Sequence, residues 1–336
     1  MLLEVRDLVI DYRVTRGNIR AVDGVSFDVP AGAVVGVVGE SGCGKTTAVR
    51  AITRVMPSSA VFTAGSISLE GEDIVQLSDR EMKKYLWRDI AYVPQSAMNA
   101  LDPVWRVGRQ IEEVLVERGG MNRKDARARS EELFAMVGLE AKRLRDYPHQ
   151  FSGGMRQRAS IALALALSPK LVIADEPVTA LDVVIQRQVL DSFAELQKKL
   201  GLSVILVTHD ISVVAYVCDY VVVMYAGKVV ERGPVADVLD NPSHPYTMGL
   251  YNAFPELAGE DRQLSPIEGS PPDLLDPPTG CRFRERCPFS LDFCTKDPSE
   301  HVVGEGHLAH CHRAIEAKDL RETAKCTTTW VGVTSE

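Results

Sequence analysis

A loop near the start of the chain has the residue types and spacing needed to bind phosphate. Residues 39–46 read Gly-Glu-Ser-Gly-Cys-Gly-Lys-Thr and match the pattern G-x-x-x-x-G-K-[ST]. The apolar run 33–38 before them is typical of a buried parallel strand. The glycines let backbone N–H groups curl toward an anion, and the positive end of the following helix faces the same point. The residues predicted to bind a nucleotide here are Gly39, Glu40, Ser41, Gly42, Cys43, Gly44, Lys45, Thr46 and Thr47.

A second anion site is predicted at residues 151–155, which read Phe-Ser-Gly-Gly-Met. Ser152, Gly153 and Gly154 place a hydroxyl and two backbone amides at the start of another predicted helix. A plain helix cap or a glycine hinge would explain Ser-Gly-Gly in isolation. Because one nucleotide has no use for two such sites, the second is expected to meet a nucleotide that a partner chain holds.

Two acids and a histidine follow apolar runs that are typical of buried strands. Asp175 and Glu176 come directly after the run 171–174, and His209 follows the run 204–208. Asp175 would hold Mg²⁺ through water, and Glu176 would polarise an attacking water molecule. The neutral imidazole of His209 would contact the terminal phosphate and keep Glu176 and the water in place.

These segments, taken in order, resemble the ATP-binding cassette (ABC) family of ATPases over residues 1–250. The resemblance implies that the Ser-Gly-Gly signature closes over ATP held by the opposite subunit of a head-to-tail dimer. Asp182 matches the segment that crosses the dimer seam after the catalytic acid. The signature departs from the usual Leu-Ser-Gly-Gly-Gln at Phe151 and Met155, both of which flank the phosphate contacts.

The resemblance also assigns an aromatic residue and a glutamine. Tyr12 lies where an aromatic side chain stacks on adenine, although a tyrosine in an alternating strand is often only packed. Gln95 lies between the core and the helical subdomain and would report Mg²⁺ and nucleotide to a membrane partner. The predicted catalytic residues are Lys45, Gln95, Glu176 and His209, and the predicted Mg²⁺ ligands are Thr46, Gln95 and Asp175.

The composition excludes several classes of protein. A formal net charge of −8 argues against non-specific binding of nucleic acid, which needs a basic surface. No apolar stretch reaches the roughly 18 residues needed to cross a bilayer. The first residues carry acids and lack the apolar block of a signal peptide. We therefore expect a peripheral protein on the cytoplasmic face of the cell membrane, held there by partner proteins.

The chain is predicted to have an α/β fold: a P-loop ABC cassette with a parallel core sheet, an antiparallel β subdomain and a helical subdomain. Residues 3–30 alternate as antiparallel strands do, with Gly17-Asn18 as the predicted turn. Residues 96–157 lack a strand pattern and form the predicted helical subdomain. Within them, residues 125–137 are predicted as a helix. Its predicted buried face consists of Ala126, Ala128, Leu133, Phe134 and Val137.

The composition changes near residue 241. Residues 241–247 read Asn-Pro-Ser-His-Pro-Tyr-Thr, and the prolines that follow predict an irregular, loop-dominated chain. This stretch resembles the tail shared by the oligopeptide and dipeptide importer subfamily. The predicted domains are therefore the cassette at residues 1–250 and a C-terminal extension at residues 251–336.

Four cysteines are clustered in this extension, at positions 281, 287, 294 and 311. Disulfides are rare in a cytosolic chain, so clustered cysteines indicate metal ligands first. Four thiolates suit a 4Fe-4S cluster, and the peptide-importer ATPases have a similar set that holds one. Zinc and free thiols are the alternatives, although the spacings are wider than in usual zinc sites. The predicted ligands, Cys281, Cys287, Cys294 and Cys311, are expected to clip a tail that buries little apolar surface.

The resemblance implies an ATP-hydrolysing motor subunit of an ABC importer for dipeptides, oligopeptides or related small solutes. Its expected partners are a second ATPase subunit, predicted to be a paralogue, two membrane permease subunits and an extracytoplasmic solute-binding protein. A regulatory nucleotide-binding module is the main alternative, but it would be expected to lack Glu176 or His209. An exporter or an ABC ATPase acting on DNA would carry fused membrane helices, a coiled-coil insertion or a second cassette.

Overall fold

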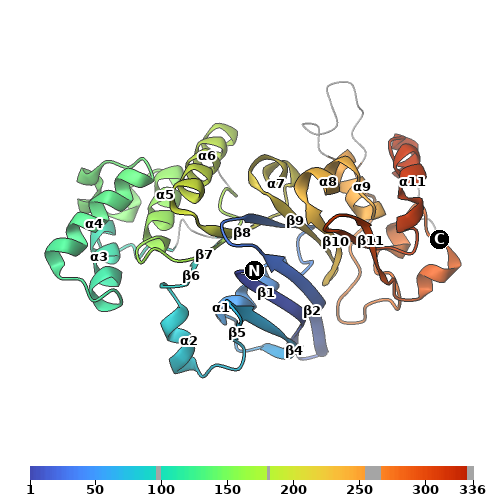
Figure 1. Ribbon diagram of the computed structural model, residues 1–336, viewed down its shortest axis with the longest axis horizontal. Coiled ribbons are helices and arrows are strands. Elements are labelled where there is room, and N and C mark those ends of the chain that lie inside the picture. The colour runs from blue at the N-terminus through green and yellow to red at the C-terminus, as the bar shows by residue number, and fades with distance from the viewer. Residues whose placement is uncertain (96–99, 180–181, 254–265, 331–336) are drawn as a thin grey trace. The chain divides into compact units, whose positions relative to one another are not determined.

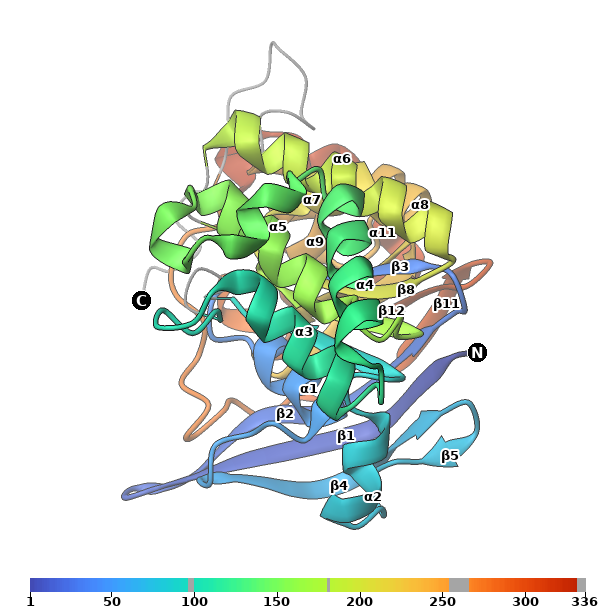
Figure 2. The same ribbon diagram turned by 90° about the vertical axis from the view of Figure 1, so that its left-hand side faces the viewer.

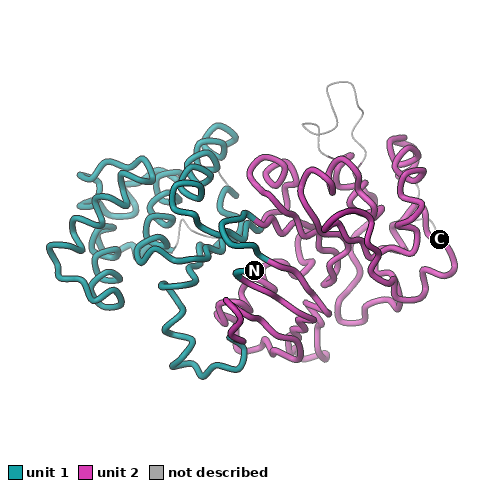
Figure 3. The backbone as a smooth tube through the Cα atoms, viewed as in Figure 1, with its two compact units in different colours: residues 1–2, 29–34, 74–207 teal, residues 3–28, 35–73, 208–336 magenta. Residues whose placement is uncertain are grey.

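The computed structural model describes residues 1–95, 100–179, 182–253 and 266–330 (Figure 1). The chain divides into two compact units (Figure 3). Unit 1 contains residues 1–2, 29–34 and 74–207, and unit 2 contains residues 3–28, 35–73 and 208–336. The predicted domain boundary near residue 250 remains a prediction.

Three parallel strands form the sheet of unit 1. Strand β7 (Leu171–Asp175) lies between β6 (Ile90–Val93) and β8 (Ser203–Thr208), and β8 belongs to unit 1 up to residue 207. Every residue of β7 and β8 is buried. A strand covered on both faces needs a continuous run of apolar residues, which explains why these segments do not alternate.

Helices make up the rest of unit 1, and Figure 2 shows α3 and α4 side by side. Between residues 100 and 157 the described chain forms helices and loops without a strand, as the sequence predicts. The helices are α2 (Asp79–Tyr85), α3 (Val107–Glu117), α4 (Arg123–Met136), α5 (Gly153–Ala164) and α6 (Val183–Leu200), with the 3-10 helices η2 (Ala141–Arg145) and η3 (Pro148–Gln150).

The helix predicted at residues 125–137 corresponds to α4, and the prediction of its buried face is wrong at one residue. Ala128 is exposed, whereas Ser130 is buried. Two residues along a helix turn a side chain by about 200°, so Ala128 points away from the face that contains Ala126. The hydroxyl of Ser130 donates to the carbonyl of Ala126 at 2.8 Å, which lets a polar residue lie on the buried face.

Unit 2 contains a four-stranded antiparallel sheet in the order β2-β1-β4-β5. The predicted turn at Gly17-Asn18 is wrong by two residues, because the turn consists of Thr15 and Arg16. Gly17 opens the second strand with a φ of 140°, a backbone conformation that favours glycine. The strands are β1 (Leu3–Val14), β2 (Gly17–Val29), β4 (Ala60–Leu69) and β5 (Glu72–Asp73).

A second group of strands in unit 2 has the order β11-β12-β10-β9-β3. Strand β3 pairs with β9 in parallel through residues 35–38, and the other neighbours pair antiparallel. The strands are β3 (Val34–Val38), β9 (Tyr220–Tyr225), β10 (Lys228–Pro234), β11 (Glu300–Gly304) and β12 (His307–His310). The helices are α1 (Lys45–Thr53), α7 (Ile211–Val217), α8 (Val235–Asp240), α9 (Pro245–Asn252) and α11 (Ala317–Ala324), with the 3-10 helices η4 (Arg284–Arg286), η5 (Asp292–Thr295), η6 (Ala314–Glu316) and η7 (Thr327–Trp330).

The C-terminal segment is more regular and better packed than its composition predicts. The His-Pro-Tyr-Thr segment begins helix α9, and β12 extends the strand group at β10. Phe283, Phe289 and Trp330 are buried in one apolar core with residues of β9 and α9. Because each such side chain contributes about 1.5–3 kcal/mol when buried, the tail is stabilised by the apolar core that it shares with β9 and α9.

A buried carboxylate ties the tail to β10. Glu231 is fully buried and accepts hydrogen bonds from the backbone N–H groups of Ser243 (2.6 Å) and His244 (2.9 Å). The ring Nε2 of His307, on β12, lies 2.7 Å from the same carboxylate. These contacts fix the start of α9 and strand β12 to one point. Within the described residues, no helix has the length and apolar character needed to span a membrane.

We predict that His244 makes unit 2 sensitive to acid. Its Nδ1 accepts the Tyr246 N–H at 3.0 Å, and burial, together with nearby His310, lowers the pKa of His244 from 6.5 to about 3. As the pH falls below 6.5, the unfolded chain binds this proton before the folded protein does, so stability is lost. His244→Asn keeps an N-cap residue without a titrating group.

Between pH 6 and pH 5, the unfolding free energy of the wild type should fall by about 1.2 kcal/mol more than that of His244→Asn. Urea unfolding of both proteins at each pH measures the difference. Because all other titrating groups are shared, they cancel in the comparison. Equal pH dependence of the two proteins would contradict the assignment.

Candidate functional site

The predicted phosphate loop lies in unit 2, between β3 and α1. Gly39, Gly42 and Gly44 have φ values of 155°, 82° and 98°, which only glycine adopts easily. A Cβ on Gly39 would lie 2.1 Å from the carbonyl oxygen of Met224, and one on Gly44 would lie 2.2 Å from that of Ala21. The loop backbone therefore packs directly on other backbone, and its curl depends on the absence of side chains.

The ammonium of Lys45 lies inside this curl. Its Nζ donates to the carbonyl oxygens of Gly39 (2.6 Å) and Glu40 (2.9 Å), and the side chain is 5% exposed. Burial raises the pKa of the neighbouring Cys43 thiol. A buried cation surrounded by loop backbone is a suitable partner for a phosphate group.

The helix that follows the loop presents its N-terminus at the same place. No described side chain caps the start of α1, so its first N–H groups remain available to an anion. Thr46 and Thr47 are half-buried in the first turn. The Thr47 hydroxyl lies 3.1 Å from the Tyr12 hydroxyl, which places the predicted adenine-stacking residue beside the loop.

Two tail residues contact the loop, and the sequence did not indicate either of them. The Tyr246 hydroxyl accepts the backbone N–H of Glu40 at 2.9 Å. Arg286 pairs with the Glu40 carboxylate through two nitrogens, at 2.8 and 3.1 Å. The sequence signal for Tyr246 is weak. This residue lies in the segment that resembles the peptide-importer tail, and nothing in that segment indicates a contact with the phosphate loop.

The predicted acids meet the predicted glutamine in unit 1. Asp175, at the end of β7, is fully buried and accepts the Tyr92 hydroxyl at 2.7 Å. The next residue, Glu176, accepts from the Gln95 amide at 2.7 Å and from the Thr179 hydroxyl at 3.0 Å. The carboxyl ends of β6 and β7 thus gather an oxygen-rich set of side chains. No pattern in the sequence indicates Tyr92 or Thr179 as part of this set.

The predicted signature residues begin a helix. Ser152 is exposed and caps α5, because its hydroxyl accepts the Met155 N–H at 3.3 Å. Gly154 is buried, and a Cβ there would lie 2.6 Å from Ile185. Asp182 is also exposed and caps α6 through the Ile185 N–H at 3.0 Å. Gly153 lies half-buried between the cap and the helix, whereas residues 180–181 are outside the described residues.

His209 directly follows β8 and belongs to unit 2. Its side chain is exposed. The next residue, Asp210, caps α7 through the Ser212 N–H at 2.8 Å, so the backbone on either side of His209 is fixed by β8 and by α7.

The prediction of a metal-clipped tail is wrong. Among the described residues, no group of three or more His, Cys, Asp or Glu side chains is placed to hold a metal ion, so neither the 4Fe-4S cluster nor zinc is supported. Burial raises the pKa of the thiols of Cys281 and Cys287, and raises that of Cys311 to about 12. Protonated thiols pack as small apolar groups. The four cysteines, Cys281, Cys287, Cys294 and Cys311, line a cavity of about 20 Å³ with Phe283 and Phe289.

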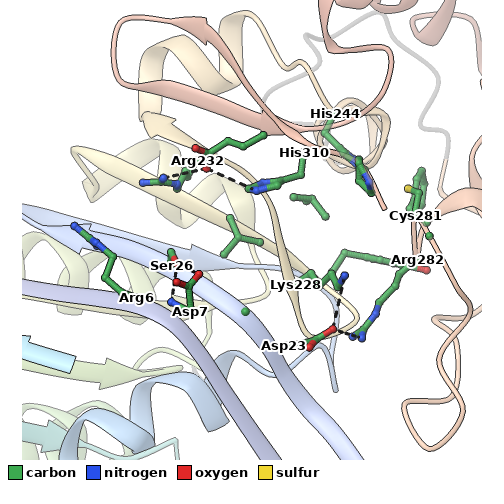
Figure 4. A pocket seen from close by; sticks show the side chains of 18 residues that line it. Arg6, Asp7, Asp23, Ser26, Lys228, Arg232, His244, Cys281, Arg282 and His310 are labelled. Carbon is green, nitrogen blue, oxygen red and sulfur yellow. Dashed lines mark hydrogen bonds and ion pairs between the residues drawn. The ribbon is translucent and has the colours of Figure 1, made fainter. Parts of the chain in front are cut away.

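A larger cavity of about 560 Å³ lies in unit 2 away from the phosphate loop (Figure 4). Three of its basic side chains pair with acids that also line it. Arg282 lies 2.6 Å from Asp23, which is also 3.7 Å from Lys228, and Arg232 lies 3.1 Å from Glu300. These pairs leave the cavity without the concentrated positive charge that a nucleotide requires, so the phosphate loop remains the candidate site.

Comparisons with known proteins agree with this geometry. The family described as "ABC transporter" matches residues 22–179, and the family described as "Oligopeptide/dipeptide transporter, C-terminal region" matches residues 230–294. The chain is 44% identical over 314 residues to the dipeptide transport ATP-binding protein DppD of Bacillus subtilis, covering 92% of this chain and 94% of DppD.

Two further proteins are similar. The oligopeptide transport ATP-binding protein OppD of Bacillus subtilis is 44% identical over 313 residues, covering 91% of this chain and 87% of OppD. A dimeric structure of the ATP-binding cassette MJ0796, in a post-hydrolysis state bound to ADP and Pi, superposes with a TM-score of 0.62 at 28% identity. This alignment covers 69% of this chain and 98% of the cassette.

The glycine geometry of the loop predicts unequal effects of two alanine substitutions. Gly44→Ala and Gly42→Ala both place a side chain on left-handed backbone, which costs about 1–3 kcal/mol of stability in each variant. Only Gly44→Ala also forces an overlap with the Ala21 carbonyl, whereas no described atom lies within 4 Å of a Cβ on Gly42. The free energy of unfolding should therefore fall by about 1–3 kcal/mol more in Gly44→Ala than in Gly42→Ala. Urea unfolding of the full chain measures this difference. Equal losses would show that the overlap is relieved.

Proposed function

The chain belongs to the ATP-binding proteins of ABC transporters, and from this premise we propose that it is the motor subunit of a peptide importer. It binds and hydrolyses ATP, and the energy drives uptake of dipeptides, oligopeptides or related small solutes. The observation that carries this proposal is the glycine-built phosphate loop around Lys45 in unit 2, and the two acids at the end of β7 in unit 1 support it. The tail match to peptide transporters supports the substrate class.

In this proposal, the loop of unit 2 binds the phosphates of ATP. Backbone N–H groups of the loop, other than those of Glu40 and Cys43, surround them, and the ammonium of Lys45 moves from the loop carbonyls to the outer phosphates. Tyr12 stacks on the adenine. Its hydroxyl contact with Thr47 holds the ring beside the start of α1.

Glu176 is the proposed catalytic acid, and it orients the water that attacks the terminal phosphate. His209 contacts that phosphate and helps to position the water. Mg²⁺ neutralises phosphate charge when bound, and Thr46, Gln95 and Asp175 would hold it. Hydroxyl, amide and carboxylate oxygens are the donors that Mg²⁺ prefers, and Asp175 has the fixed, buried carboxylate such a site needs.

The signature segment serves a second ATPase subunit. Ser152, Gly153 and Gly154 at the start of α5 contact ATP that the partner subunit holds, and Asp182 lies at the seam. The exposure of Ser152 and Asp182 supports this role, because both side chains remain accessible while they cap their helices. We propose a paralogous ATPase as the partner in a head-to-tail dimer.

Unit 1 is proposed to dock on the membrane subunits, of which the importer has two. Val104 and Trp105 are large apolar side chains with 70% and 41% of their surface exposed. They line a cavity of about 500 Å³ with Arg106, Arg109 and Tyr147, and the Arg109 guanidinium lies 3.6 Å from the Trp105 ring centre. Exposed apolar side chains around a hollow are typical of a docking surface. The chain therefore works at the cytoplasmic face of the membrane, with an extracytoplasmic solute-binding protein completing the system.

We predict that two substitutions separate nucleotide binding from hydrolysis. Lys45→Ala should abolish productive ATP binding, because it removes the cation inside the phosphate loop. Glu176→Gln should retain ATP binding and lower the hydrolysis rate about 10²- to 10⁴-fold, because only the water-orienting acid is lost. Steady-state ATPase rates and ATP retention in the assembled complex measure both effects. Undiminished turnover in Glu176→Gln would refute the assignment of the catalytic acid.

We also predict the composition of the assembly. Purification of the intact transporter from its native membrane should recover this chain with one different ATPase and two membrane subunits, identified by mass. In liposomes that hold the complex, uptake of a labelled dipeptide should require ATP. Two copies of this chain with no other ATPase would contradict the paralogous pair, and ATP hydrolysis that no peptide stimulates would contradict the substrate class.

A further inference from the structure

The phosphate loop contains an acid in an electrostatically unfavourable place. Glu40 is the second residue of the loop, and its neighbour Gly39 and its own carbonyl both contact the Lys45 ammonium. A free carboxylate there would repel a polyphosphate and compete for Lys45, since like charges within a few ångströms destabilise each other. The Glu40 side chain must therefore be neutralised or turned away if the loop is to bind ATP.

Arg286 of the tail meets this requirement. Its two terminal nitrogens lie 2.8 and 3.1 Å from the two oxygens of Glu40, a bidentate pair. The arginine side chain is 5% exposed and the glutamate side chain 26%, so solvent screens the pair only weakly. Arg286 is held independently, because its Nε donates to the carbonyl of Glu268 at 2.8 Å and its Nη1 contacts the Tyr225 hydroxyl at 3.3 Å.

A second tail residue fixes the backbone at the same position. The N–H of Glu40 donates to the Tyr246 hydroxyl at 2.9 Å, so it points toward α9. Tyr246 is fully buried and packs against Tyr225 and Phe283, with ring centres 4.7 and 5.4 Å away. Glu40 is thus held at its backbone and at its carboxylate by residues more than 200 positions away in the sequence.

We propose that the C-terminal extension is part of the nucleotide site: Arg286 neutralises the Glu40 carboxylate and, with Tyr246, holds the phosphate loop in its ATP-binding form. Arg286 is a positioning residue that acts through Glu40. The proposal rests on the proposed function, because it assumes that the loop binds ATP. It predicts that the charge balance between these two side chains sets ATP affinity.

The tail provides a matched control. Arg282 lies four residues from Arg286, is also buried, and pairs with Asp23 at 2.6 Å (Figure 4). Its Nη1 also donates to the carbonyl of Ala226. Arg282 therefore ties the tail to strand β2 with a buried ion pair of the same kind, but it has no contact with Glu40 among its described interactions.

The test is ATP binding to the purified full chain, measured by displacement of a fluorescent ATP analogue. Arg286→Gln should weaken ATP binding roughly tenfold, because it leaves the Glu40 carboxylate without its partner. Arg282→Gln should change ATP affinity less than about twofold, although both variants lose a buried pair and similar stability. The double variant Glu40→Gln with Arg286→Gln should recover ATP affinity to within about threefold of wild type, because the repelling charge is gone.

Equal ATP affinities in Arg286→Gln and Arg282→Gln, or no recovery in the double variant, would overturn the proposal. If Arg286→Gln does not fold, ATP binding to the single variant Glu40→Gln tests the proposal. It leaves an unopposed guanidinium beside the loop, so it should strengthen ATP binding about threefold and increase its salt dependence. Unchanged or weaker binding in that variant would overturn the proposal. The proposed function is tested separately: the wild type should bind ATP, and Lys45→Ala should not.

Discussion

Arg282, Arg286 and Glu231 are charged side chains of unit 2 that are almost fully buried, and the tail depends on how their charges are satisfied. Charge is buried at a high cost unless a partner charge and hydrogen bonds replace the lost water. Each of the three has such partners: Arg282 has Asp23, Arg286 has Glu40, and Glu231 has two backbone N–H groups and His307. Since these partners come from distant parts of the chain, the pairs determine where the tail packs.

The aromatic packing of the tail follows from these fixed points. Phe283 lies between the two arginines in the sequence, and its ring contacts those of Tyr225 and Tyr246 at 5.2 and 5.4 Å. Trp330 lies 6.3 Å from Phe289 and covers the same core from the end of the described chain. The apolar burial supplies stability, whereas the ion pairs select one arrangement.

Short-range sequence patterns predicted the features that depend on residues close together in the chain. The glycine spacing of the phosphate loop, the apolar run before it and the acids that end β7 are all short-range signals. The hairpin of β1 and β2 was predicted, but its turn at Thr15 and Arg16 was not, because Gly17 is used for its positive φ and not as a turn centre. Ala128 was misplaced because it lies two residues from Ala126, a spacing that turns it about 200° around the helix and away from the buried face.

Long-range partners were out of reach of the sequence. Glu40 and Arg286 are 246 residues apart, and neither residue type shows that the other is near. Strand β12 pairs with β10, which is distant in the sequence, as well as with its neighbour β11, and its short sequence does not indicate the pairing with β10. The cysteine spacing did predict that four thiols share one place, since they line a single cavity. It could not predict that burial raises the pKa of the Cys287 and Cys311 thiols and so disfavours their ionisation.

The arrangement at the end of β7 shows how hydrolysis could be kept under control. Glu176 has a φ of 48°, an uncommon conformation for a residue with a side chain, and its N–H donates to the carbonyl of Val207 at 2.9 Å. The backbone of Glu176 is therefore fixed against β8, and this limits the positions that its carboxylate can reach. One carboxylate oxygen accepts from both Gln95 and Thr179, which leaves that oxygen less able to orient water. If Glu176 acts as proposed, movement of Gln95 away from this oxygen would free the oxygen to orient the attacking water.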